Sequence, residues 1–217
     1  MIFSNLSISE LLQNFIVLFT AITVHEYSHG LIANRLGDPT ARAMGRLTLN
    51  PMAHLDPLGA LMMVFCRFGW AKPVPVNPYY FDEPKKGMMF VALAGPASNL
   101  LLALLVATIY PFLWMFMPSI FGITTFMGGL FIACIGVNVS FAVFNLIPFP
   151  PLDGSKILFS LLPNEVYNKL LTYERYGTVI LIVLSFTGVL GSILDLIINP
   201  VFGLYIKWIN FLLNLIA

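Results

Sequence analysis

Two histidines and a glutamate stand close together in an otherwise apolar part of the sequence. His25 and His29 are four positions apart, and Glu26 directly follows the first histidine. Residues four apart lie on one face of a helix, so the two imidazoles can bind a single zinc ion. Glu26 then supplies a carboxylate that can deprotonate a water molecule activated by the metal. This H-E-x-x-H pattern is typical of metalloproteases, and its apolar setting predicts a site inside a membrane.

A third metal ligand must come from elsewhere in the chain, because catalytic zinc sites usually have three protein ligands and one open position. One candidate is His54, the only remaining histidine. The other is Asp153, which follows an apolar segment. That segment and the one carrying the histidines are both expected to end on the same side of the membrane, which brings Asp153 to the depth of the histidines. The residues alone leave both candidates open.

The composition excludes an ordinary soluble domain. The chain has 217 residues, of which 59% are hydrophobic and 10% charged, whereas soluble domains are roughly 25% charged. The net charge of +1 provides no basic surface for a nucleic-acid partner. Cys66 and Cys134 lie in apolar surroundings without the spacing of a metal site, so neither a disulfide framework nor a cysteine metal site is expected.

Several apolar stretches are long enough, at about 20 residues, to cross a bilayer. They are residues 11–36, 88–117, 124–147 and 177–198, followed by a shorter and weaker stretch at 201–217. The first stretch is preceded by no lysine or arginine, so it is expected to be a retained segment rather than a signal peptide. We predict one α-helical polytopic membrane domain over 1–217, with about five to six membrane segments and C-terminal helices within 177–217.

The distribution of basic residues predicts the orientation. Clusters of lysine and arginine follow the first segment, precede the second and follow the third, whereas residues 118–123 carry no charge. By the positive-inside rule the basic stretches are cytoplasmic and the uncharged link is outside. The N-terminus is then outside, and the His-Glu-His motif lies toward the cytoplasmic side.

The region 37–87 is expected to form a small cytoplasmic insertion. Residues 44–50 and 72–77 alternate apolar and polar side chains as short strands do, and the prolines of the second restrict it to a sheet edge. Such an edge accepts an extended peptide by strand addition. The alternative is a polar connector rich in turn residues. Residues 58–69 are apolar but too short to span, as in a re-entrant or interfacial piece.

The order of the motifs resembles that of the site-2 proteases, polytopic zinc enzymes that cleave transmembrane segments of other proteins. The resemblance is carried by the His-Glu-Tyr-Ser-His run at 25–29, Gly-Pro-Ala-Ser-Asn at 95–99, Pro-Leu-Asp-Gly at 151–154, and the stretches 37–41 and 45–51. The last two are similar to a compact, mainly prokaryotic branch. No stretch is long enough for the PDZ domain that many relatives contain.

The resemblance implies roles for individual residues. His25, His29 and Asp153 would be ligands of one zinc ion, and Glu26 would be the catalytic base. Asn99 would lie near the substrate and donate a hydrogen bond to the developing oxyanion; the alternative is an amide that links helices. The expected partners are a transmembrane protein or peptide substrate and membrane lipids, in a prokaryotic cytoplasmic membrane.

Two further residues are candidates near this site. His54 is expected to contact the substrate, stabilise the tetrahedral intermediate or act as an extra ligand, unless it is an interfacial histidine paired with Asp56 or with a backbone carbonyl. Asn145 is expected to brace the turn that presents Asp153. Neither role follows from the metal motif itself.

Three other functions compete with hydrolysis of peptide bonds in or near transmembrane helices. The first is another zincin type with a glutamate as third ligand, but Glu83, Glu165 and Glu174 lie outside the apolar segments. The second is a non-enzymatic metal-binding protein or transporter, which normally has polar groups along a path through several segments. The third is an inactive homologue, which the presence of Glu26 disfavours.

Overall fold

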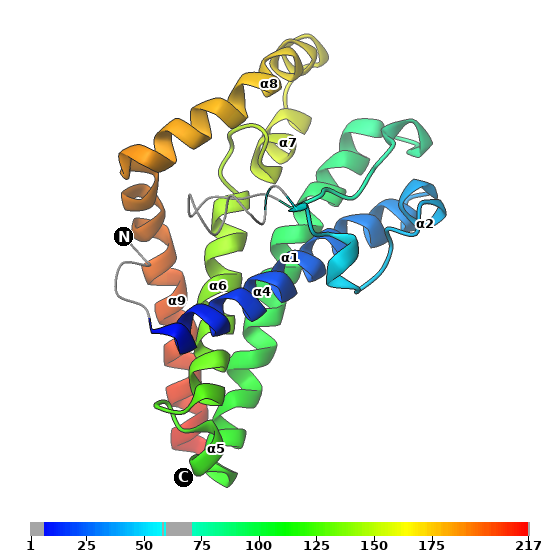
Figure 1. Ribbon diagram of the computed structural model, residues 1–217. Helices are drawn as coiled ribbons and strands as arrows, with labels where there is room; N and C mark the ends of the chain where they lie inside the picture. Colours follow the sequence, from blue (N-terminus) through cyan, green and yellow to red (C-terminus); the bar gives the residue numbers. More distant parts are fainter. Residues whose placement is uncertain (1–6, 58, 60–70, 217) are drawn as a thin grey trace.

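The computed structural model describes residues 7–57, 59 and 71–216, and the regular elements within them are all helical (Figure 1). In chain order they are α1 (Ile8–Arg35), α2 (Thr40–Ala43), the 3-10 helices η1 (Pro51–Ala53) and η2 (Pro78–Tyr80), α4 (Pro84–Phe116), α5 (Pro118–Phe121), α6 (Phe126–Asn145), α7 (Asp153–Ser160), α8 (Asn164–Thr187) and α9 (Val189–Ile216).

Four helices in the described residues are long and apolar enough to cross a membrane: α1, α4, α6 and α9. The first three match the predicted segments 11–36, 88–117 and 124–147 to within about one turn at each end. The prediction of a helical polytopic membrane protein is therefore confirmed. Five to six membrane segments were predicted, whereas four helices in the described part of the chain are candidate spans, so the predicted number is not confirmed.

The C-terminal helices divide at a different place from the one predicted. The expected segments 177–198 and 201–217 leave a boundary between residues 198 and 201, but α9 continues through this stretch, including Pro200. The break lies instead at Gly188, which has a φ of 75° and ends α8. A glycine adopts this left-handed conformation without steric cost, whereas membrane helices tolerate proline in their interior. The predicted boundary between residues 198 and 201 is therefore wrong.

The helix starts follow from local hydrogen bonding. Ser7 and Glu10 form a capping box at α1, in which the Glu10 N–H donates to Ser7 Oγ over 3.2 Å and the Ser7 N–H donates to Glu10 Oε2 over 2.7 Å. The hydroxyl of Thr125 accepts the Gly128 N–H over 3.0 Å at the start of α6. Helix α4 begins with Pro84, where the missing N–H costs nothing.

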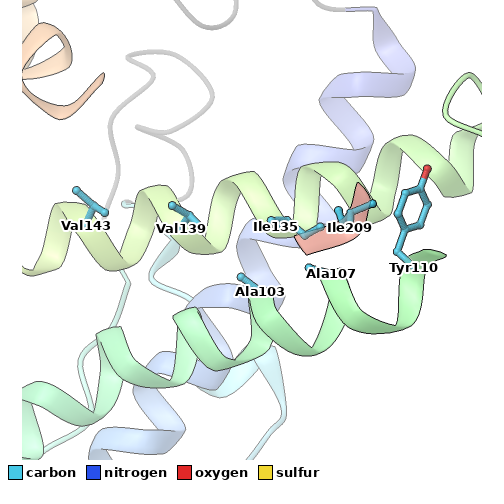
Figure 2. Close-up of a cluster of buried hydrophobic side chains, with 7 residues drawn as sticks. All are labelled: Ala103, Ala107, Tyr110, Ile135, Val139, Val143 and Ile209. Carbon is cyan, nitrogen blue, oxygen red and sulfur yellow. The ribbon is translucent and has the colours of Figure 1, made fainter. Parts of the chain in front are cut away.

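The core lies between α4, α6 and α9 (Figure 2). Small side chains at Ala103 and Ala107, one turn apart on α4, face Ile135 and Val139 of α6 and are fully buried. Small residues let membrane helices approach closely, because association there depends on van der Waals contact. Helix α1 packs across both α4 and α6, and α7 packs on α4. This arrangement brings the C-terminal half of α1, the N-terminal half of α4 and the start of α7 together.

The predicted small sheet does not form, because neither of its two segments is a strand. After α2 the chain turns at Gly45, with a φ of 65°, and residues 46–50 contain bends. Residues 71–77 have no regular secondary structure and pair with no neighbouring strand. The predicted re-entrant piece at 58–69 lies, apart from residue 59, outside the described residues.

Two backbone N–H groups of 72–77 donate to side chains instead of to a strand. The Val74 N–H donates to Glu26 Oε2 over 2.8 Å, and the Asn77 N–H donates to Asp38 Oδ2 over 2.7 Å. Carboxylates accept stronger hydrogen bonds than backbone carbonyls do. Alternation of residue types therefore predicted an extended segment correctly but not its partners.

Candidate metal centre and catalytic cavity

Three potential metal ligands converge from α1 and α7. The Nε2 atoms of His25 and His29 each lie 3.1 Å from Oδ2 of Asp153. One ligand atom from each of the three residues lies within 4.8 Å of the others. Two imidazole nitrogens and one carboxylate oxygen are a donor set that zinc uses in catalytic sites. The chemistry and spacing of this donor set therefore fit a single zinc ion.

The opposite ring nitrogens fix the orientation of both histidines. Nδ1 of His29 lies 2.7 Å from the carbonyl oxygen of Val91, and Nδ1 of His25 lies 2.7 Å from Oδ1 of Asn99. Both partners belong to α4, and a carbonyl oxygen can only accept. Each Nδ1 therefore carries the proton, which leaves each Nε2 with a lone pair for the metal.

Gly95 permits this close approach of α4. A Cβ atom added there would lie 2.5 Å from Cε1 of His25 and 2.5 Å from Cε1 of His29. No side chain fits at that distance, so α4 can bring its carbonyl acceptors to the histidines only with glycine at this point. The Gly-Pro-Ala-Ser-Asn element thus combines a close helix contact at Gly95 with a hydrogen-bond acceptor at Asn99.

Asp153 is presented by a tight turn after α6. A Cβ atom added at the adjacent Gly154 would lie 2.2 Å from the carbonyl oxygen of Leu146. The start of α7 is therefore packed directly on the end of α6, and only glycine fits between them. This packing explains why a glycine follows Asp153.

The charge state of Asp153 follows from its neighbours. Burial by itself would raise the pKa of this carboxyl, but without a metal the His29 and His25 rings, when protonated at Nε2, are positive partners and hydrogen-bond donors that hold the pKa well below its usual range. A metal ion would replace these Nε2 protons. Lys156 Nζ lies 3.8 Å from Oδ1 of Asp153. The group is therefore a carboxylate, which is the form that binds a metal.

Glu26 lies beside a cavity of about 290 Å³ that the three potential ligands share. Further lining comes from α4, from residues 73–76, and from Asn145 and Lys156. One oxygen of Glu26, Oε2, accepts the Val74 N–H. The carboxylate thus faces the same small space as the donor set, which is the place a general base requires.

Asn99 lies within the site, but its contacts differ from those predicted. The side chain is fully buried. Its Oδ1 faces His25, and its Nδ2 donates to Ala21 O over 3.0 Å and to Asn138 Oδ1 over 2.8 Å. Both polar atoms are therefore engaged within the protein, which favours orientation of His25 over donation to a substrate oxyanion.

Asn145 lines the cavity, and its Nδ2 donates to Phe141 O one turn earlier on α6 over 2.9 Å. No hydrogen bond joins it to the described turn before Asp153. Asn145 therefore lies where a substrate in the cavity could reach it, and the described hydrogen bonds do not support the predicted bracing of the turn.

His54 lies in the insertion, apart from the three converging ligand atoms. It is buried, and its Nε2 lies 2.8 Å from the Thr48 carbonyl oxygen. Its Nδ1 has no partner among the described residues. The group of potential ligands contains Asp153 and not His54, so the geometry favours Asp153 as third ligand. The predicted contact of His54 with a substrate stays a prediction.

Three contributors to the site were missed by sequence reasoning. The Val91 carbonyl and the Val74 N–H are backbone groups, so no residue type identifies them. Asn138 is a fully buried amide in an apolar helix, seven positions before Asn145. A polar residue in a membrane segment is usually functional, and that signal was sufficient to find it.

The comparisons with known proteins agree with this geometry. A model of peptidase family M50 matches residues 121–190. "Putative zinc metalloprotease YwhC" of Bacillus subtilis is 39% identical over 178 residues, covering 82% of this chain and 81% of that protein. "Putative zinc metalloprotease Rip2" of Mycolicibacterium smegmatis is 32% identical over 179 residues, covering 79% of this chain and 65% of that protein. No solved structure matches significantly.

Proposed function

The chain belongs to peptidase family M50, the site-2 proteases, and on this premise we propose that His25, His29 and Asp153 hold its zinc ion and that Glu26 is its general base. The family and the named relatives make the protein an intramembrane zinc metalloprotease. The observation that carries the residue assignment is the convergence of two Nε2 atoms on Oδ2 of Asp153, with both Nδ1 atoms bonded to α4.

The chemistry divides between the metal and the protein. Zinc, when bound, polarises the scissile carbonyl and lowers the pKa of a water molecule. Glu26 accepts the proton of that water and passes it to the leaving nitrogen. Because Oε2 accepts the Val74 N–H over 2.8 Å and Oε1 accepts no hydrogen bond from the described residues, we assign the proton transfer to Oε1. Asn99 and the Val91 carbonyl keep the two imidazoles in the orientation that this reaction needs.

The proposed substrate is a transmembrane segment of another protein that has locally unwound. A helical segment hides its peptide groups in its own N–H to C=O hydrogen bonds. The scissile residues must therefore unwind and enter extended before the carbonyl can be attacked. Pro73, Val74 and Val76 line the cavity in an irregular backbone conformation. Because the Val74 N–H is bonded to Glu26, the Val76 N–H is the backbone donor among these three residues with which an extended peptide can pair.

We place the protein in a prokaryotic cytoplasmic membrane with its active site toward the cytoplasm. The site lies at the C-terminal end of α1, the N-terminal half of α4 and the start of α7, on the side where Arg35, Lys85 and Lys156 occur. Basic residues next to short loops remain cytoplasmic. Water then reaches the site from the cytoplasm.

A transporter is not favoured, because the polar residues of the site gather at one depth and not along a path. The test is cleavage of membrane-spanning leucine–alanine peptides with a central Gly-Pro pair, labelled with a fluorophore and a quencher, by the purified protein in vesicles. We expect Glu26→Gln to abolish cleavage while retaining about one zinc per chain. Glu165→Gln, an exposed change on α8, should cleave at the wild-type rate.

Cleavage that survives in Glu26→Gln would contradict the proposed base. Zinc flux into the vesicles by both the wild type and Glu26→Gln, without peptide cleavage, would support the transporter instead.

A further inference from the structure

The general base is held by a single backbone N–H group. Val74 stands between Pro73 and Pro75, and prolines have no N–H, so Val74 is the only donor in these three residues. The Val74 N–H donates to Oε2 of Glu26 over 2.8 Å. This hydrogen bond restrains the carboxylate at one oxygen, while the other oxygen accepts no hydrogen bond from the described residues. The position of Val74 therefore determines where the base points.

Arg46 in turn holds the peptide before Val74. Its Nη2 donates to the carbonyl oxygens of Lys72 over 2.8 Å and of Pro73 over 3.2 Å. These are consecutive carbonyls, so one guanidinium fixes the plane of the chain at the point where it enters the cavity. The Lys72 N–H donates to His54 O over 2.9 Å and secures the same residue from the other side.

Arg46 is buried, and the two carbonyls are its hydrogen-bond acceptors among the described residues. The residue is only 8% exposed, and no carboxylate forms an ion pair with it in the described part of the chain. Burying a cation without a charged partner is costly. Hydrogen bonds from a charged donor are roughly twice as strong as neutral ones, so the carbonyls of Lys72 and Pro73 offset part of that cost.

The far end of the segment is held by a charge of opposite sign. Asp38 is fully buried, and its Oδ2 accepts the Asn77 N–H over 2.7 Å. Segment 72–77 is therefore tied at its start by Arg46, at its middle by Glu26 and at its end by Asp38. The catalytic base is thus the middle attachment of a segment whose two ends are held independently of it.

We propose that Arg46 is a positioning residue for catalysis, which acts through the Lys72–Val74 peptides to hold the Val74 N–H against Glu26. This inference rests on the proposed function, in which Glu26 is the general base. Its consequence is that removal of Arg46 or of the Val74 N–H misplaces the same carboxylate. Zinc binding should be unaffected, because His25, His29 and Asp153 are held by α4 and α7.

Two substitutions at one position separate the N–H from the side chain. Val74→Pro removes the donor but keeps an apolar side chain of similar size, in a stretch whose neighbours are already prolines. Val74→Ala keeps the donor and removes side-chain packing. We expect Val74→Pro and Arg46→Ala each to lower kcat about 10- to 100-fold, since small misplacements of catalytic groups have effects of this size. KM and zinc content should stay near wild type, and Val74→Ala should retain clearly more activity than Val74→Pro.

The double variant is the decisive measurement. If Arg46 acts through the Val74 N–H, Arg46→Ala combined with Val74→Pro lowers kcat no further than the stronger single change. If the two losses of kcat multiply in the double variant, the proposal is overturned. A wild-type kcat in Arg46→Ala would also overturn it, and this result can be obtained even if Val74→Pro fails to fold. Arg42→Ala, an exposed arginine on α2, is the matched control and should match the wild type.

A readout independent of activity is hydrogen–deuterium exchange of the 72–77 peptide, which has amides only at 72, 74, 76 and 77. We expect faster exchange in Arg46→Ala and unchanged exchange in Arg42→Ala. Unchanged exchange in Arg46→Ala would refute the proposal that Arg46 holds the 72–74 backbone in place. The exchange rate at 72–77 does not depend on which residue is the general base. Failure of the proposed function would therefore be seen in a different experiment, as peptide cleavage by Glu26→Gln.

Discussion

Gly95→Ala is the smallest change that tests whether α4 holds both imidazoles in place. The added Cβ would lie 2.5 Å from the Cε1 atoms of His25 and His29 and 2.6 Å from Nε2 of His25. Carbon atoms in contact normally stand ~3.5–4.0 Å apart. Either the rings or α4 must therefore shift by ~1 Å, whereas metal–ligand distances are held to within ~0.2 Å.

The expected loss of zinc affinity follows from the cost of this overlap. Overpacking a well-packed site costs ~1–3 kcal/mol, and ~1.4 kcal/mol is a factor of ten in affinity. We therefore expect Gly95→Ala to bind zinc roughly 5- to 150-fold more weakly, measured by competition with a coloured chelator in detergent. Activity should fall at the same time, because the Nε2 atoms no longer converge on Asp153.

The matched control is Gly203→Ala on α9, where an added Cβ meets nothing within 4 Å. This variant should bind zinc as the wild type does, and its free energy of unfolding should rise slightly because alanine favours a helix. Zinc affinity and melting temperature at wild-type values in Gly95→Ala would refute the reasoning, since they would show that α4 does not press on the rings.

Three further predictions concern the metal and the orientation. Asp153→Ala should leave well under one zinc per chain, measured by elemental analysis, and full retention would exclude Asp153 as an essential ligand. Chelation of zinc should lower the melting temperature of the wild type, because a ligand bound only by the folded state stabilises it; an unchanged value in the chelated protein would argue against a resident metal. In a background without Cys66 and Cys134, Tyr79→Cys should react with an impermeant maleimide only from the cytoplasmic side and Ile123→Cys only from outside; both positions are exposed, and the reverse pattern would invert the proposed topology.

Hydrophobic runs predicted the first three membrane helices closely, because length and apolarity are what a bilayer requires of a helix. They failed at the C-terminus, where the boundary between the last two segments was predicted between residues 198 and 201. Pro200 lies inside α9, and the break is at Gly188. Hydropathy does not distinguish these cases, since both residues are common in membrane helices and only the backbone conformation shows which one ends the helix.

The convergence of His25, His29 and Asp153 was predicted by residue spacing for the histidines and by the order of the motifs for the aspartate. The segment 72–77 was only half predictable: its alternation indicated an extended chain, but the Val74 and Asn77 N–H groups donate to Glu26 and Asp38. Local pattern encodes the conformation of a segment, whereas these hydrogen-bond partners lie more than 30 positions away in the chain.

The two histidines are oriented by groups of different kinds, and this difference predicts unequal sensitivity to substitution. His29 is held by the carbonyl of Val91, which no side-chain change removes. His25 is held by the side chain of Asn99, itself held by Asn138. Asn99→Ala should therefore free the His25 ring and weaken zinc binding about 10- to 100-fold, as loss of such partners does elsewhere.

Val91→Ala is the matched change at the other histidine, because it keeps the carbonyl that His29 needs. Its loss of zinc affinity should be clearly smaller than that of Asn99→Ala, measured by the same chelator competition. Asn138→Ala should have an intermediate effect, since it removes the acceptor of Asn99 but not the contact with His25. Equal losses in Asn99→Ala and Val91→Ala would show that helix packing, and not the hydrogen bond to Nδ1, orients the rings.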